Sequence, residues 1–169
     1  ASIGEQIFFI RHFSKAKPDA LVIECMAVNP QYQWISEHKI VKSTIGVMTN
    51  VRPDHLDEMG ISIEQITKSM GNTIPFNGIM VTSEDKQIEL LEDISLERKS
   101  EFHSCNISNL SNKDISNFQY LEHKENISLA IKVCELCGVD KAVALKGMSK
   151  CNPDPGALTI WKIRYKNTG

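Results

Sequence analysis

The chain has 169 residues, of which 41% are hydrophobic, and its formal net charge at pH 7 is −2. This size allows one sizeable hydrophobic core, so one domain is the default expectation. The scattered Lys and Arg residues lack the basic footprint of a nucleic-acid-binding protein. No stretch approaches the roughly 18 apolar residues of a membrane helix. The five cysteines, an odd number, favour reduced thiols in a cytosolic setting.

Helices are predicted along the whole chain. The first begins with a capping-box pattern at residues 2–5 and runs to about Lys15. Later helices are indicated by apolar residues at helical spacing and by their start and stop signals. In chain order, these later helices cover residues 30–42, 62–70, 83–92, 123–138 and 139–148.

Short apolar runs between these helices predict strands. They cover residues 20–28, 44–48, 78–82, 101–107 and 157–165. Residues 108–117, which are rich in Ser and Asn, predict a loop. Because strands alternate with helices, we predict an α/β fold with a mostly parallel sheet and helices on both faces.

The most informative stretch is Thr44–Asp57. Its apolar run, which contains no charge, is typical of a strand buried on both faces. It ends in a polar cluster that includes Asn50, Asp54 and His55, at the edge of the sheet where ligands bind in open α/β folds. An imidazole beside carboxylates suits a hard cation carrying phosphate, or acid–base chemistry. A capped loop with a surface salt bridge is the alternative.

Glu24 lies inside the apolar run Ala20–Val28, which also reads as a buried strand. A lone ionised carboxylate there is costly unless a cation or strong hydrogen-bond donors meet it. Glu24 is therefore predicted to be a metal ligand or catalytic acid that shares a cleft with His55. A structural glutamate paired with Arg52 is the alternative.

Cys134 and Cys137 form a single C-x-x-C motif within an amphipathic helical pattern. A structural zinc ion would need two more ligands at suitable spacing. We therefore favour two buried helix cysteines over a metal site.

The motif Asn50–Asp57, NVRPDHLD, resembles the N-[IV]-x-x-D-H-x-D signature of the central ATPase domain of the Mur ligase superfamily. The run Val22–His38 then resembles the amide-ligase subunits of poly-γ-glutamate synthases, the CapB/PgsB type. Thr73–Pro75 and Asn152–Leu158 fit the same family.

The resemblance implies an ATP-dependent amide ligase that uses Mg²⁺ and forms poly-γ-glutamate through an acyl phosphate. It implies that Glu24 and His55 are catalytic and ligate magnesium, and that Asn126 meets the adenine. Asn50 and Asp54 would contribute to the same nucleotide site. The implied partners are glutamate, the growing polyglutamate, and membrane subunits of a capsule synthase. Those subunits would hold a cytoplasmic protein at the inner face of the membrane.

The sequence also departs from the family pattern. The phosphate-binding G-x-x-x-x-G-K-[ST] loop is absent, and in the family it precedes the first helix found here. We therefore expect residues 1–153 to be part of the central ATP-binding domain, and residues 154–169 to be a linker and the first strand of a ligase domain. By itself, the 169-residue chain is expected to bind Mg–ATP weakly.

Three further positions concern function. Ala157 stands where an arginine is usual, and Met70 where some relatives have a modified lysine, with Lys68 nearby. The alternative functions are another Mur-type amino-acid or folate ligase, or a non-catalytic binding module. In such a module, an apolar docking patch would consist of Tyr32, Trp34 and Ile35.

Overall fold

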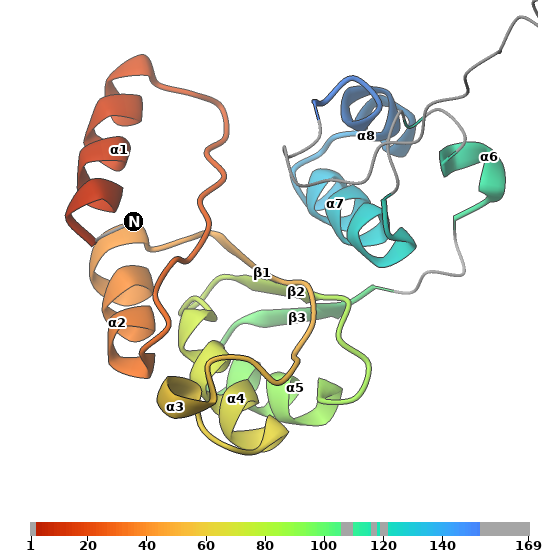
Figure 1. Cartoon of the computed structure of the whole chain (residues 1–169). Helices are drawn as coiled ribbons and strands as arrows, with labels where there is room; N and C mark the ends of the chain where they lie inside the picture. The colour runs from red at the N-terminus through yellow and green to blue at the C-terminus, as the bar shows by residue number, and fades with distance from the viewer. Residues whose placement is uncertain (1–2, 106–109, 116–117, 119–121, 153–169) are drawn as a thin grey trace, which may run out of the picture. The chain divides into compact units, whose positions relative to one another are not determined.

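The structure is a computed structural model that describes residues 3–105, 110–115, 118 and 122–152 (Figure 1). The chain divides into two compact units, Ala1–Ser104 and Cys105–Gly169. The strand predicted at residues 157–165 and the domain expected from residue 154 lie outside the described residues. Among the described helices, none combines the length and the apolar character needed to cross a membrane.

The first unit is built on a three-stranded parallel sheet. Its strands are β1 (Ile45–Met48), β2 (Ile79–Thr82) and β3 (Glu101–Ser104), and they lie side by side in this order. The predicted α/β class with a parallel sheet is confirmed. Because the three strands run in the same direction, the loops that follow them leave from one edge of the sheet.

Helices of the first unit supply part of the core that covers this sheet. They are α1 (Ile3–Ala16), α2 (Pro30–Ile35), the π-helix η1 (Ser36–Val41), α3 (Leu56–Met59), α4 (Ile63–Met70), the 3₁₀-helix η2 (Gly71–Thr73) and α5 (Ile88–Glu97). Helices α3, α4 and α5 lie along one face of the sheet (Figure 1). Met48 and Met80 from the strands meet Ile66 and Leu91 from the helices in one buried cluster.

The prediction of a buried strand over residues 20–28 is wrong. This segment connects α1 and α2 without helix or strand, and Val22 is 95% exposed. A strand needs a neighbour to pair its backbone groups, and none of the described strands pairs with this segment. The prediction that β1 is buried on both faces is also wrong. Val47 is half-exposed, whereas Gly46 and Met48 are buried.

The helix expected to start at residue 83 or 84 begins later. Helix α5 starts at Ile88, because the residues before it form a turn around the side chain of Glu84. The backbone N–H groups of Lys86 and Gln87 donate hydrogen bonds to the Glu84 Oε1 atom. The carboxylate thus satisfies amide groups that would otherwise need a helix or water.

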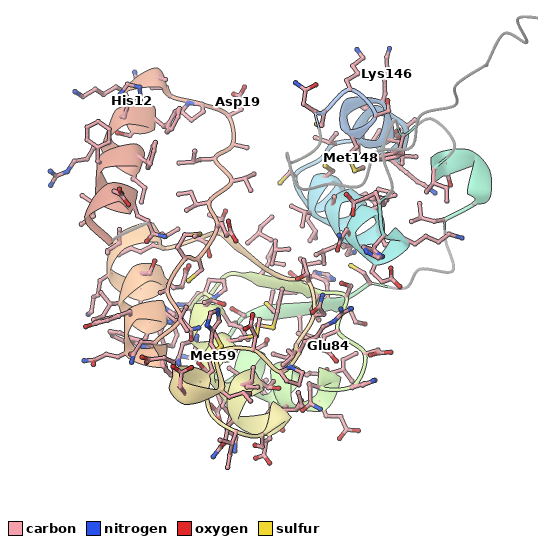
Figure 2. All side chains as sticks on the ribbon, viewed as in Figure 1. His12, Asp19, Met59, Glu84, Lys146 and Met148 are labelled. Atoms are coloured by element: carbon pink, nitrogen blue, oxygen red, sulfur yellow. The ribbon has the colours of Figure 1, made fainter. Side chains whose placement is uncertain are left out.

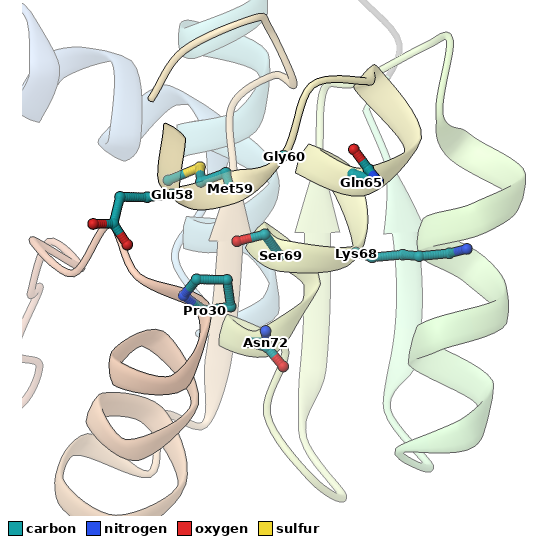
Figure 3. A pocket seen from close by; sticks show the side chains of 8 residues that line it. All are labelled: Pro30, Glu58, Met59, Gly60, Gln65, Lys68, Ser69 and Asn72. Atoms are coloured by element: carbon teal, nitrogen blue, oxygen red, sulfur yellow. The ribbon is translucent and has the colours of Figure 1, made fainter. Parts of the chain in front are cut away.

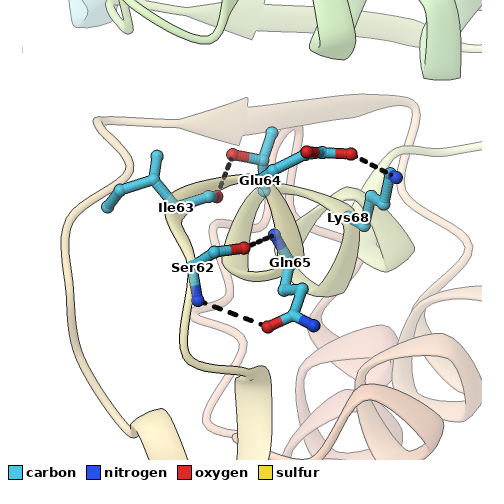
Figure 4. Close-up of polar contacts among 6 residues, drawn as sticks. Ser62, Ile63, Glu64, Gln65 and Lys68 are labelled. Atoms are coloured by element: carbon cyan, nitrogen blue, oxygen red, sulfur yellow. Dashed lines mark hydrogen bonds and ion pairs between the residues drawn. The ribbon is translucent and has the colours of Figure 1, made fainter.

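Helix α4 begins at a capping box (Figure 4). The Ser62 hydroxyl accepts a hydrogen bond from the Gln65 backbone N–H at 3.2 Å, and the Gln65 Oε1 atom accepts one from the Ser62 backbone N–H at 3.3 Å. The Glu64 and Lys68 side chains form an exposed i,i+4 ion pair at 2.6 Å. Because α4 carries Ile66 into the core, the cap fixes where this face of the helix starts.

Replacing Ser62 with Ala is expected to lower the free energy of unfolding by about 1 kcal/mol, since the backbone N–H of Gln65 loses its acceptor. Urea unfolding of the purified protein measures this change. The matched control is Lys68→Ala, which removes only the exposed ion pair and is expected to change the free energy of unfolding less than Ser62→Ala does. Equal losses in the two variants would contradict a stabilising cap.

A second network lies where the chain enters β2 and β3. The Arg98 Nη1 group donates hydrogen bonds to the Ile74 carbonyl at 2.6 Å and to His38 Nε2 at 3.2 Å. The His38 ring contacts Trp34 and Phe76 in tilted arrangements, with centroid distances of 5.2 and 4.7 Å. Burial lowers the pKa of His38, and the positive charge of Arg98 lowers it further. The folded protein therefore favours a neutral His38 that accepts the Arg98 hydrogen bond.

This network predicts a pH dependence of stability. In the unfolded chain His38 takes up a proton near its ordinary pKa of about 6.5, whereas in the folded protein it does so only at lower pH. The free energy of unfolding should therefore fall as the pH falls below about 6.5, and this contribution should level off below the folded-state pKa. Urea unfolding across this range should show a shallower pH dependence for His38→Gln. Identical slopes would rule out His38 as the source.

Three helical segments of the first unit end in a lysine in the left-handed conformation. Lys17 follows α1 with φ 49°. Lys42 follows η1 with φ 54°, and Lys99 follows the end of α5 with φ 56°. The Lys42 N–H donates to the Glu37 carbonyl at 2.7 Å, and the Lys99 N–H donates to the Leu96 carbonyl at 3.0 Å. These turns redirect the chain into β1 and β3.

The second unit is described as three helices, α6 (Asn112–Ile115), α7 (Lys124–Leu136) and α8 (Lys141–Met148). Its core cluster includes Leu110, Ile127 and Ile131. Helix α6 lies where the sequence predicted a loop, and α7 and α8 lie where helices were predicted. The expectation of two buried cysteines is wrong for Cys137, which is exposed at the C-cap of α7, and Cys134 is only partly buried.

Candidate functional site

The predicted polar cluster does follow the end of β1. After Met48 the chain forms a loop through Asn50, Asp54 and His55 that leads into α3. Asn50 is partly buried, whereas Asp54 and His55 are exposed. This loop lies at the carboxyl edge of the parallel sheet, which is the edge where α/β proteins of this type bind ligands.

His55 occupies a strained position at the start of α3. Its φ and ψ angles are 45° and 49°, a left-handed conformation that costs a non-glycine residue about 1–2 kcal/mol. Its carbonyl accepts the N–H groups of Glu58 and Met59, and its own N–H donates to the Asp54 side chain at 2.9 Å. Such strained residues are concentrated at functional sites. The turn leaves the imidazole half-exposed, with its Nε2 atom 3.7 Å from an Asp54 oxygen.

Glu24 lies in the segment before α2, and its side chain is exposed. Its backbone carbonyl accepts a hydrogen bond from the Gln6 side chain at 3.2 Å. The carboxylate forms no hydrogen bond or ion pair with His55 in the described part of the chain. The segment that carries Glu24 and the loop that carries His55 are connected indirectly. Asn29 caps α2 and also donates to the Glu58 carboxylate of α3 at 2.8 Å.

A pocket of about 380 Å³ lies beside this connection (Figure 3). It is bounded by the start of α2, by α3 and by α4, and Gly60 forms part of its wall. Gly60 has φ 116°, and a Cβ atom built there would lie 2.5 Å from the Gln65 Cβ atom. The α3–α4 turn therefore requires glycine. The lining residues are Pro30, Glu58, Met59, Gly60, Gln65, Lys68, Ser69 and Asn72.

Sequence reasoning missed the residues that hold this edge together. Thr82, at the end of β2, is fully buried, and its hydroxyl donates to the Met48 carbonyl at 2.9 Å. The next residues are Ser83, whose hydroxyl donates to the Thr49 carbonyl, and Glu84, a buried carboxylate labelled in Figure 2. The ends of β1 and β2 are therefore joined by side chains as well as by the strand ladder.

Asn126 belongs to the second unit. It lies on α7, is partly buried, and donates a hydrogen bond from its Nδ2 atom to the Glu122 side chain at 2.7 Å. A role at an adenine ring remains a prediction, as do the nucleotide roles of Asn50 and Asp54.

The donor chemistry at the His55 loop fits a magnesium ion held mainly by a nucleotide. Within the described residues, no three His, Cys, Asp or Glu side chains gather into a cage for a metal ion. Mg²⁺, however, usually keeps several waters and takes only one or two protein ligands beside substrate phosphates. Exposed oxygen and imidazole groups at the sheet edge suit that open mode of binding.

Comparison with known proteins identifies the family of the chain. Residues 5–149 match the family described as the Mur ligase middle domain. The chain belongs to this family. It is 35% identical over 162 residues to the capsule biosynthesis protein CapB of Bacillus anthracis, covering 96% of this chain and 35% of that protein. It is 36% identical over 159 residues to the PGA synthase CapB of Bacillus subtilis (strain 168), covering 94% of this chain and 40% of that protein.

A solved structure supports the fold. The structure described as E. coli FolC in complex with DHPP and ADP has a TM-score of 0.57 and 16% sequence identity. The match covers 72% of this chain and 33% of that one. At this identity the similarity shows the fold alone. The chain spans about a third to two fifths of the length of the CapB relatives.

Proposed function

We propose that this chain is the ATP-binding part of a ligase that joins glutamate units into poly-γ-glutamate. The observation that carries the proposal is the 35–36% identity, over at least 94% of the chain, to a capsule biosynthesis protein and a PGA synthase. The family match spans residues 5–149 and so includes Glu24, His55 and Asn126. The strained, half-exposed His55 at the carboxyl edge of the sheet agrees with this role.

The chemistry would proceed in two steps. A carboxylate oxygen of the growing polymer attacks the γ-phosphorus of ATP, the bond to ADP breaks, and an acyl phosphate forms. The amino group of the incoming glutamate then attacks the acyl carbon, loses a proton, and releases phosphate. Bound Mg²⁺ would neutralise the negative charges that meet in the first step.

The chain's own residues would hold and orient the reactants. Glu24 and His55 would ligate magnesium, while Asn50 and Asp54 support the nucleotide site. Asn126 would bind the adenine. Glu24 is exposed in a segment without a strand, and in this proposal its carboxylate and the His55 ring share one ion. Membrane subunits of a capsule synthase are the proposed partners, at the inner face of the membrane.

Replacing His55 with Ala in the whole natural protein that carries this chain tests the metal role. Glutamate-dependent ADP release should fall by roughly a hundredfold, since a group that positions charge in the transition state is lost. His55→Asn should behave in the same way, and it separates lost chemistry from lost folding because asparagine tolerates the left-handed conformation.

The matched control is His12→Ala, which removes an exposed histidine on α1. Its rate of ADP release should stay at the wild-type value. If both His55 variants are folded and turn over like the wild type, His55 has no metal role.

The second candidate is another Mur-type ligase, one that joins a different amino acid or acts on a folate. The whole natural protein should release ADP with glutamate and polyglutamate and remain near background when another amino acid replaces glutamate or a folate replaces polyglutamate. A panel assay of ADP release measures this preference. A higher rate with any other acceptor would replace the glutamate polymer as the proposed product.

A further inference from the structure

Glu84 is a buried carboxylate with an unusual set of partners. Glu84 lies two residues after the end of β2, and it is only 6% exposed. It accepts backbone N–H hydrogen bonds from Val51 at 2.6 Å, Lys86 at 2.8 Å and Gln87 at 3.3 Å. Such bonds to a carboxylate are stronger than those between neutral groups, and they offset the cost of burying the charge.

The two oxygens of this carboxylate serve two different loops. Oε2 accepts the Val51 N–H in the loop after β1, and Oε1 accepts both N–H groups of the turn that leads into α5. The Glu84 backbone N–H in turn donates to the Thr82 hydroxyl at 3.0 Å. One side chain therefore joins the carboxyl ends of two neighbouring strands.

Val51 anchors the loop that carries His55 to the core. From Thr49 to Glu58, a stretch that the structure describes in full, Val51 is the one buried residue. Its side chain belongs to the core cluster, and its N–H is bound to Glu84. Residues 52–58 are all exposed, so Val51 is the buried anchor that precedes His55, while Glu58 after it is held by Asn29.

We propose that Glu84 is a positioning residue for His55. The proposal rests on the proposed ligase function. The Glu84 carboxylate fixes the backbone at Val51, four residues before His55, so that the imidazole meets its ligand in one orientation. In this proposal Glu84 acts through the loop and does not itself touch the nucleotide or the reacting atoms.

The glutamine variant Glu84→Gln isolates this role because it keeps the shape of the side chain. The amide has one acceptor oxygen, which can serve either Val51 or the turn before α5, but not both. The amide nitrogen then faces a backbone N–H, and one loop is released.

The matched control is Glu37→Gln. Glu37 is also buried, at 7% exposure, and its Oε1 atom accepts the Ser43 N–H and hydroxyl at 2.8 and 3.0 Å. Ser43 precedes β1, at the end of the strand away from His55. This variant perturbs a buried carboxylate of the same unit without touching the His55 loop.

The experiment uses the whole natural protein and two readouts. Hydrogen exchange, followed by mass spectrometry of peptides covering residues 49–55, should be roughly tenfold faster in Glu84→Gln than in the wild type or Glu37→Gln. The kcat for glutamate-dependent ADP release should fall roughly ten- to a hundredfold, with little change in the KM for ATP, while Glu37→Gln keeps the wild-type kcat.

Unchanged exchange in residues 49–55, or faster exchange with a wild-type kcat, would overturn the proposal. If Glu84→Gln does not fold, Glu84→Asp keeps the charge but is too short to serve both loops, and the same two changes are expected. A wild-type protein that releases no ADP with any acceptor overturns the proposed ligase function instead. The exchange readout then still decides whether Glu84 holds the loop.

Discussion

Parallel pairing of three short strands is the constraint on which the first unit depends. Because β1, β2 and β3 run in the same direction, every loop that follows a strand leaves from the same edge of the sheet. Backbone hydrogen bonds impose this arrangement before any side chain is considered. The position of the candidate site is therefore a consequence of topology, and the side chains only refine it.

Buried polar groups perform this refinement at both ends of the strands. At the carboxyl edge, Thr82 and Glu84 bind backbone groups of the loop that follows β1. At the opposite end, Arg98 binds the Ile74 carbonyl and the neutral ring of His38. In both places a charged or polar side chain takes over backbone hydrogen bonds where the ladder stops. Buried groups of this kind specify one arrangement of the loops, because each has few alternative partners.

The sequence was most informative where local chemistry decides the structure. The strand Ile45–Met48 and helices α4 and α7 lie where the apolar patterns of the sequence predicted them. It was misleading for residues 20–28, whose apolar run predicted a buried strand. Composition indicates that a segment can be a strand, but only a pairing partner makes it one, and no local pattern contains that information.

Glu84 was missed for a related reason. The sequence predicted a helix that begins at Ser83 or Glu84, and this placed Glu84 at a helix start. Its main partner, Val51, lies 33 residues away in the sequence. A buried carboxylate that binds a distant amide leaves no periodic signal. The polar cluster around His55, in contrast, is contiguous, and its motif could be recognised directly.

The left-handed lysines at the ends of η1 and α5 have a consequence for engineering. At each position the left-handed backbone conformation costs a residue with a Cβ atom about 1–2 kcal/mol, whereas glycine adopts this conformation freely. Glycine would recover this energy but would lose about 0.5–1 kcal/mol to the greater freedom of the unfolded chain. Lys42 and Lys99 are therefore two positions where the first unit can be stabilised without a new contact, and both lie away from the His55 loop, before the strands rather than after them.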